Sequence, residues 1–296
     1  MDLDKRCAPT KNYEEGSCFD ISSLKQIALK YNEENKDKIK ISDNKTNLIN
    51  QLENKFLKSC SDQRCWLGLD TVKSLNNEEI INNTFRPVGP SKQLDWLSTT
   101  HINEVIDQYQ AKYSDFLFLG AVPYDFEEVP VLGLNNIDFN KFIKDGKTKI
   151  GIVINLDEHD ENGSHWVALY ADLKKNQIYF FDSVGKKPGK KIKKFINKIV
   201  KFLYKQQNNK DLLLQDLLKN KSENNITILQ KKLKGFDIRY NHIQHQFKNS
   251  ECGVYSINFI VRLVKGEKFD DIINTITKDD VMNKCRNTYF RNVNIK

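Results

Sequence analysis

Apolar positions recur with strand spacing through the second half of the 296-residue chain. The polar turn at 174–176 is short, which predicts that the runs on either side of it pair as an antiparallel hairpin. The stretches that predict the strands of a buried sheet are 116–122 (a strand or the end of a helix), 149–156, 165–173, 177–182 and 236–245.

Helical spacing alternates with these strands. Residues 190–206 place apolar side chains on one face and lysines on the other, which is typical of an amphipathic helix. Ser98, Thr99 or Thr100 can begin a helix that runs to about Tyr109. Further helices are expected at 254–264 and at 277–290, the latter beginning near residue 279, whereas 123–147 reads as mostly loop and 207–225 as a polar insertion with a helical patch at 212–218.

The first 85 residues form a separate, helical pattern. Residues 24–31 give one helical face, a second helix is expected after Ser42 or Asp43, and 60–75 reads as another helical piece. The run Arg86–Pro90 breaks regular structure, so we predict a helical N-terminal arm domain at 1–85 and a core domain at 86–296. The two arm helices faintly resemble the SAP type of nucleic-acid-binding module; the simpler alternative is an arm that packs on the core domain or on a partner.

Net charge and cysteine content limit the partners and the redox environment that are expected for this protein. The net charge of +8 favours acidic surfaces or nucleic acid as neighbours, although a well-solvated surface explains it equally simply. The six cysteines lack the density of a secreted scaffold and no signal peptide is recognisable, so mostly free thiols are expected. Zinc held by Cys7, Cys18, Cys60 and Cys65 is a weaker alternative. No apolar run is long enough to span a membrane.

Three residues have the types and positions that thiol chemistry requires. Cys252 opens a predicted buried helix, where unpaired backbone N–H groups favour a thiolate. His165 opens one strand of the predicted hairpin and Asp182 closes the other. An antiparallel pairing places these two at the same edge of the sheet, so Asp182 can orient His165 toward the sulfur.

Two further residues complete this pattern. The side-chain amide of Gln246 and the backbone N–H of Cys252 can both donate to a developing oxyanion, without any metal or other cofactor. Gly253 lets a substrate backbone approach closely. Each residue alone has an ordinary structural explanation, as core, strand end or turn, but together and in this order they predict a catalytic site.

His165-Trp166, Phe181-Asp182-Ser183 and Gln246 followed by Cys252-Gly253 resemble the adenain and SUMO-protease group of cysteine peptidases. The layout over 86–296 is similar to the African swine fever virus type of polyprotein-processing protease of large DNA viruses, which also has a helical arm. That type can have Asn as the third member of its catalytic set, at the position where this chain has Asp182. The polar stretch 207–225 has no obvious counterpart in compact members of the group.

The resemblance implies an α+β, papain-like fold with a central mixed sheet flanked by helices. It implies that Trp96 and Trp166 form the walls of a narrow tunnel, in which two aromatic faces admit glycine and exclude side chains. It further implies a thiol endopeptidase that cleaves viral structural polyproteins after Gly-Gly-type sites during virion maturation, in the virion and in the viral factory of the host cytoplasm.

Alternatives remain open at this stage. The same fold could remove ubiquitin or SUMO from host conjugates, and acyl transfer uses similar triads. A non-catalytic virion protein that holds DNA or capsid through a basic N-terminal arm is the alternative from another class.

Overall fold

The structure is a computed structural model, which describes residues 16–60, 63–77, 80, 87–92, 94–217 and 225–290. The chain divides into two compact units, Met1–Gln93 with Lys284–Lys296, and Leu94–Asn283. Each unit is described by itself. The division into domains at about residue 85 stays a prediction.

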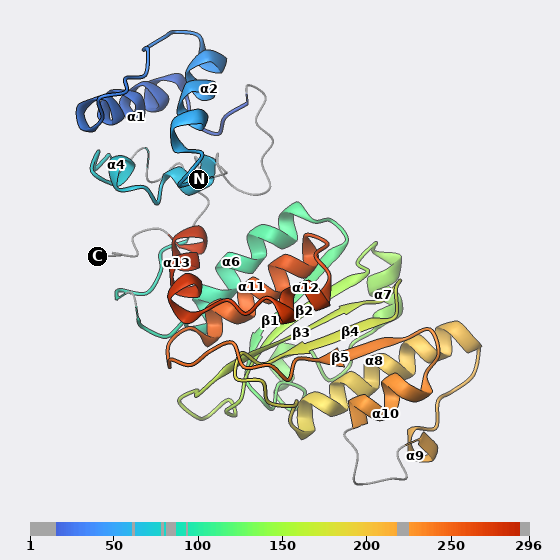
Figure 1. The fold of residues 1–296 in the computed structure, drawn as a ribbon. Helices are drawn as coiled ribbons and strands as arrows, with labels where there is room; N and C mark the ends of the chain where they lie inside the picture. Colours follow the sequence, from blue (N-terminus) through green and yellow to red (C-terminus); the bar gives the residue numbers. More distant parts are fainter. Residues whose placement is uncertain are drawn as a thin grey trace. The chain divides into compact units, whose positions relative to one another are not determined.

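A five-stranded mixed sheet forms the centre of the larger unit (Figure 1). The strands pair in chain order: β1 runs parallel to β2, β3 is antiparallel to both β2 and β4, and β5 runs parallel to β4. The predicted hairpin is therefore present, with Ala168 opposite Phe181. The strands span β1 Phe116–Val122, β2 Lys149–Asn155, β3 Trp166–Asp172, β4 Gln177–Phe181 and β5 Asp237–Tyr240.

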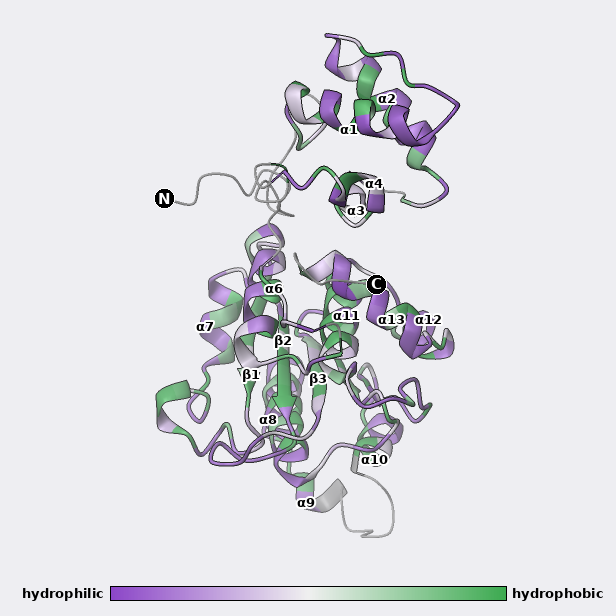
Figure 2. Ribbon diagram, turned by 90° about the vertical axis from the view of Figure 1, so that its left-hand side faces the viewer, coloured by the Kyte–Doolittle hydropathy of each residue, from purple (hydrophilic) through white to green (hydrophobic). Residues whose placement is uncertain are grey.

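Helices cover both faces of this sheet, because its strands are apolar on both sides (Figures 1 and 2). On one face, Ile152, Leu169 and Phe180 belong to a single apolar cluster with the inward side chains of α8, Lys190–Asn208. On the other face, Phe181 stacks on Phe259 of α11, at 4.8 Å between ring centroids. The predicted α+β fold with a flanked mixed sheet is confirmed.

The helices of the second face are amphipathic or fully buried. Ser98 caps α6 by accepting from the backbone N–H of His101, as one of the predicted caps. Gly151 faces α11, since a Cβ at that position would lie 3.2 Å from Ile260. Helices on this side span α6 Thr99–Lys112, α11 Cys252–Val264 and α12 Phe269–Asn274; α13 follows at Asp279–Tyr289.

The structure differs from the predicted pattern by short helices in stretches that were expected to be mostly loop. The stretch 123–147 is not all loop, since it holds a 3-10 turn, Pro130–Leu132, and the helix α7, Phe139–Lys144. Apolar runs this short give no helical period, which is why the sequence did not reveal them. The insertion holds α9, Leu214–Leu217, and α10, Asn225–Lys232, follows it.

The smaller unit has its own apolar core. Phe19 and Phe56 each pack on Trp66, and all three are buried. The cap of α2 is Asn44, not Ser42 or Asp43. The helices of this unit span α1 Ile21–Glu34, α2 Lys45–Phe56, α3 Gln63–Trp66 and α4 Asp70–Lys73.

The expectation of mostly free thiols is wrong in this unit. Cys18 and Cys60 are both disulfide-bonded, which leaves neither of them a thiolate for zinc. Sequence spacing carries no information on which cysteines meet in space, and small cores gain most from such bonds. Cys7 and Cys65 lie outside the residues whose side chains are described. Throughout the described part of the chain, no helix is long and apolar enough to cross a membrane.

Candidate active site

The β3–β4 hairpin brings His165 and Asp182 together. His165 immediately precedes β3 and Asp182 immediately follows β4, so both lie at the same edge of the sheet. The distance from His165 Nε2 to Asp182 Oδ1 is 2.7 Å. The side chain of His165 is 18% exposed and that of Asp182 only 2%, so the bond is shielded from water on the carboxylate side.

The Asp182 backbone is fixed from both directions by Asn241. The Asn241 side chain accepts from the Asp182 N–H at 2.8 Å and donates to the Asp182 carbonyl at 2.7 Å. Asn241 also donates to the Ile243 carbonyl, and it is fully buried. The Asp182 carboxylate additionally accepts from the Val184 N–H at 2.8 Å. The carboxylate therefore has little freedom to move away from the imidazole.

Cys252 meets this pair from a distant part of the sequence. It is the first residue of α11 and a free, buried thiol, and it lies close enough to His165 to help raise the pKa of the imidazole. Because Nε2 is engaged by Asp182, the imidazole presents Nδ1 to the sulfur. Burial by itself lowers the pKa of His165, but the hydrogen bonds to Asp182 and Cys252 outweigh it and raise the pKa to about 9.

Gln246 lies on the loop that leads to the cysteine, and its amide is held at both ends. The Oε1 atom accepts from the Ser183 hydroxyl at 2.6 Å, and Nε2 donates to the Lys248 carbonyl at 2.6 Å. Fixing Oε1 removes the freedom of the amide to flip. Nε2 carries two hydrogens, so one remains for an oxyanion.

Two buried carboxylates hold the 246–251 loop. Asp279, the first residue of α13, accepts from the backbone N–H groups of Phe247 and Lys248 at 2.9 and 3.1 Å. Glu251 accepts from the Ser250 hydroxyl at 2.6 Å and from the Asn283 amide at 2.8 Å. The loop is thereby positioned by side chains of a helix that follows it in the chain.

The three residues predicted to contact substrate differ in exposure and packing. Trp96 is 47% exposed, whereas Trp166 is buried and its indole N–H donates to the Leu97 carbonyl at 2.9 Å. A Cβ on Gly253 would lie 3.0 Å from the Leu97 Cβ. Leu97 therefore fills the space beside Gly253 on this side, and the expectation that Gly253 lets a substrate backbone approach closely stays a prediction.

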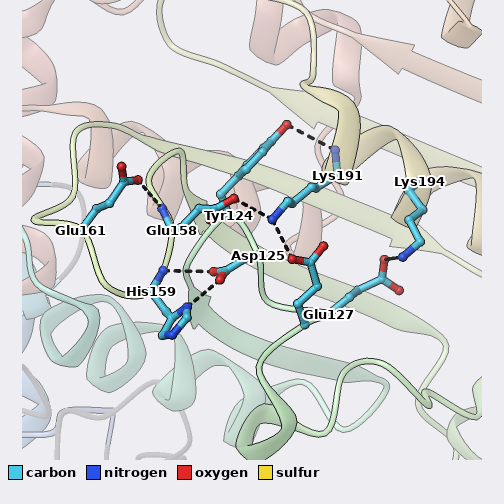
Figure 3. A network of polar contacts seen from close by, with 9 residues as sticks. Tyr124, Asp125, Glu127, Glu158, His159, Glu161, Lys191 and Lys194 are labelled. Carbon is cyan, nitrogen blue, oxygen red and sulfur yellow. Dashed lines mark hydrogen bonds and ion pairs between the residues drawn. The ribbon is translucent and has the colours of Figure 1, made fainter.

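Both tryptophans line one groove, of about 580 Å³. Its lining also includes residues of the acidic loop 157–163, which directly precedes Ser164 and His165. Figure 3 shows how this loop is held: His159 bonds to the buried Asp125 through Nδ1, at 2.6 Å, and through its backbone N–H, at 3.0 Å. Lys191 adds an ion pair to Glu158 at 2.7 Å.

Sequence reasoning missed the residues that act through others. Asn241 and Ser183 bond to the candidate residues Asp182 and Gln246, whereas Glu251 and Asp279 hold the loop between Gln246 and Cys252. Asn241 follows the β5 strand directly, and a polar residue at that position is the one signal that could have drawn attention to it. Among the described residues, no group of three or more His, Cys, Asp or Glu side chains could hold a metal ion.

Comparisons with known proteins place this geometry in a family. The model of the Ulp1 protease family, C-terminal catalytic domain, matches residues 141–294. A "putative thiol protease" of Acanthamoeba polyphaga mimivirus is 34% identical over 97% of this chain and 93% of its own length. A cysteine protease of African swine fever virus (strain Badajoz 1971 Vero-adapted) is 24% identical over 82% of this chain and 88% of its own.

The fold agrees with these sequence relationships. The crystal structure of the African swine fever virus pS273R protease superimposes with a TM-score of 0.52, covering 82% of this chain and 89% of that one at 22% identity. The mimivirus relative is aligned over almost the whole of both chains, so the likeness is not confined to the core. The chain is a cysteine peptidase and belongs to the Ulp1 protease family.

Proposed function

We propose that this peptidase is an endopeptidase that cleaves viral structural polyproteins after Gly-Gly-type sites during virion maturation. The observation that carries the proposal is the meeting of His165, Asp182 and the Cys252 thiol at one end of the sheet, beside the held amide of Gln246. The mimivirus and African swine fever virus relatives of this chain come from large DNA viruses, which supports the viral part of the proposal. We therefore place the protein in the virion and in the viral factory of the host cytoplasm.

The proposed reaction runs through a covalent thioester. The thiol proton of Cys252 passes to His165 Nδ1 before the substrate is attacked, in line with the raised pKa of the imidazole, and the sulfur then adds to the scissile carbonyl carbon. Collapse of the tetrahedral intermediate breaks the C–N bond, and the imidazolium gives its proton to the leaving amine. A water molecule, deprotonated by the same imidazole, then hydrolyses the thioester and frees the sulfur.

The surrounding residues have defined parts in these steps. Asp182 stabilises the imidazolium, which agrees with the raised pKa of His165, and holds the ring by its 2.7 Å bond. The developing oxyanion accepts from the backbone N–H of Cys252 and from the remaining amide hydrogen of Gln246. Such donors contribute roughly 3 kcal/mol each to the transition state in related acyl transfers.

Substrate selection follows from the groove. Trp96 and Trp166 both line the groove, and a backbone held against aromatic faces is accommodated best when it carries no side chains. Glycines are selected because larger residues are excluded. A folded modifier is the second candidate substrate, since another African swine fever virus relative is described as a SUMO-1 cysteine protease.

The decisive experiment is incubation of candidate virion precursors with wild-type protein, with Cys252→Ala and with Cys285→Ala as the matched control. We expect wild type and the control to release products with Gly-Gly C-termini, identified by mass spectrometry, and Cys252→Ala to release none. Retained cleavage by Cys252→Ala would rule out the assigned nucleophile. Covalent capture of a SUMO or ubiquitin probe, with no cleavage of precursors, would favour the second candidate.

A further inference from the structure

The positive charge of this protein is not distributed evenly. Residues 1–85 contain 13 Lys and Arg against 14 Asp and Glu, so the predicted basic N-terminal arm is not basic. Residues 183–210 contain ten lysines and no Asp or Glu. The net charge of +8 is therefore concentrated on α8 and on the turn before it.

A groove runs along this helix, with a volume of about 770 Å³. We call it the lysine groove, after the five lysines that line it: Lys190, Lys193, Lys194, Lys198 and Lys201. Glu127 is its acidic lining residue, and this carboxylate pairs with Lys198 at 2.9 Å and with Lys194 at 3.6 Å. Figure 3 shows Lys194 reaching toward Glu127. One carboxylate cannot neutralise five cations.

The arrangement is electrostatically unfavourable in the free protein. Lys190 and Lys193 lie in the first turn of α8, which has no acidic residue, so cations stand at the positive end of the helix dipole. Like charges one helical turn apart also repel one another. Burial, and then repulsion from Lys187, lower the pKa of Lys193. An anion in the groove would relieve all of these costs.

The shape of the lysine groove selects the kind of anion. Residues 190–201 span about 16 Å of helix, over which one strand of a DNA duplex presents roughly five phosphates. The described lining has no aromatic ring on which an unpaired base could stack, which disfavours single strands. An extended row of flexible point charges fits a repeating phosphate backbone better than a compact polyphosphate.

We propose that the lysine groove binds the phosphate backbone of double-stranded nucleic acid, without sequence preference. The duplex lies along α8, and the lysines displace its condensed counterions. Binding here is independent of peptide cleavage, since none of the five lysines contacts His165, Asp182 or Cys252 through a described bond.

The test is fluorescence anisotropy with a labelled duplex of about 25 base pairs and scrambled sequence, titrated between 50 and 200 mM salt. Five phosphate contacts predict a slope of about −4.5 in log K against log salt, or on the order of 500-fold weaker binding over that range. Lys190→Gln/Lys193→Gln/Lys201→Gln should reduce the slope by about 2.7. Glutamine keeps good helix propensity, and circular dichroism checks the fold.

The matched control removes the same charge elsewhere, as Lys141→Gln/Lys144→Gln/Lys268→Gln, at exposed positions of the same unit. It should keep the wild-type slope, and Cys252→Ala should bind duplex like wild type. Equal weakening by the control variant, or an unchanged slope in the groove variant, would overturn the proposal. Displacement of the duplex by tripolyphosphate or poly-glutamate as effectively as by unlabelled duplex would also overturn it.

Discussion

His165 and His159 lie close together in the sequence, and each bonds to a buried aspartate. The ring-to-carboxylate distances are nearly equal, 2.7 Å to Asp182 and 2.6 Å to Asp125, and both histidines have a raised pKa. What differs is the surroundings. The His165 side chain is 18% exposed and its second nitrogen meets a thiol, whereas that of His159 is 59% exposed.

In the proposed mechanism, this difference separates a catalytic histidine–aspartate pair from a structural one. The bond and the raised pKa are common to both pairs, so neither identifies a catalytic base. The two pairs differ in the burial of the histidine and in the group that meets its second ring nitrogen. His159 holds the 157–163 loop against Asp125, whereas His165 is the proposed proton acceptor for Cys252.

The largest expected effect is on kcat/KM, when His165 and His159 are replaced one at a time. His165→Gln removes the proton acceptor and should lower kcat/KM for a Gly-Gly-x peptide by about 1,000-fold. His159→Gln should lower it by no more than about threefold, and mainly through KM, because the residue lines the groove and does not touch the thiol. A comparable loss of kcat in both variants would show that the two pairs are not functionally distinct.

Replacing the two aspartates should separate the two pairs in the same way as replacing the histidines, with a smaller loss of activity. Asp182→Ala leaves His165 unoriented and should reduce kcat by about 100-fold with little change in KM. Asp125→Ala frees the 157–163 loop and should raise KM while kcat stays near wild type. Steady-state kinetics of both variants on one peptide separate the effect on kcat from the effect on KM. A fall of kcat with unchanged KM in Asp125→Ala would contradict this prediction.

A smaller effect is expected at Asn241, which positions Asp182 by its backbone. Asn241→Ala leaves the buried Asp182 N–H unpaired, whereas the Asp182 carbonyl keeps its bond from the Gly185 N–H, so the variant should lower the free energy of unfolding by about 1–3 kcal/mol and kcat by about tenfold. Asn208→Ala is the control, since its side chain bonds the Tyr204 carbonyl at the surface. Urea unfolding and kinetics at one temperature check both. A loss of stability with unchanged kcat would reduce Asn241 to a purely structural role.

The smallest effect is on pH dependence. The folded protein keeps a proton on His165 up to about pH 9, while the unfolded chain releases it near pH 6.5. The folded state therefore binds more protons in this window, and the contribution of His165 to stability is lost as pH rises through it. Asp182→Asn should flatten this dependence, measured by urea unfolding at pH 6.5, 8 and 9. An equally steep slope in the variant would show that another group is responsible.

The sequence predicted the parts of this site that depend on local pattern. His165 and Asp182 were placed together because a short turn joins two apolar runs, and the structure has that hairpin. Cys252 was placed at a helix start for a similar reason, and α11 begins there. These features need only periodicity and a turn.

The rest depended on contacts that no local pattern contains. Asn241 and Asp279 act on residues far away in the sequence, and the disulfides of Cys18 and Cys60 depend on which side chains meet in space. The packing of Leu97 against Gly253 is a further contact of this kind. The roles assigned to the catalytic residues stay predictions until the variants are measured.

The order of the reactive residues along the chain also bears on when the enzyme can first become active. The hairpin that carries His165 and Asp182 is a local structure that can form soon after synthesis of its residues. The sulfur follows much later in the chain, at the start of α11, and its loop is secured by Asp279, which is later still. In the proposed mechanism, a chain truncated before Cys252 therefore has no nucleophile, and we expect it to leave neighbouring proteins uncleaved.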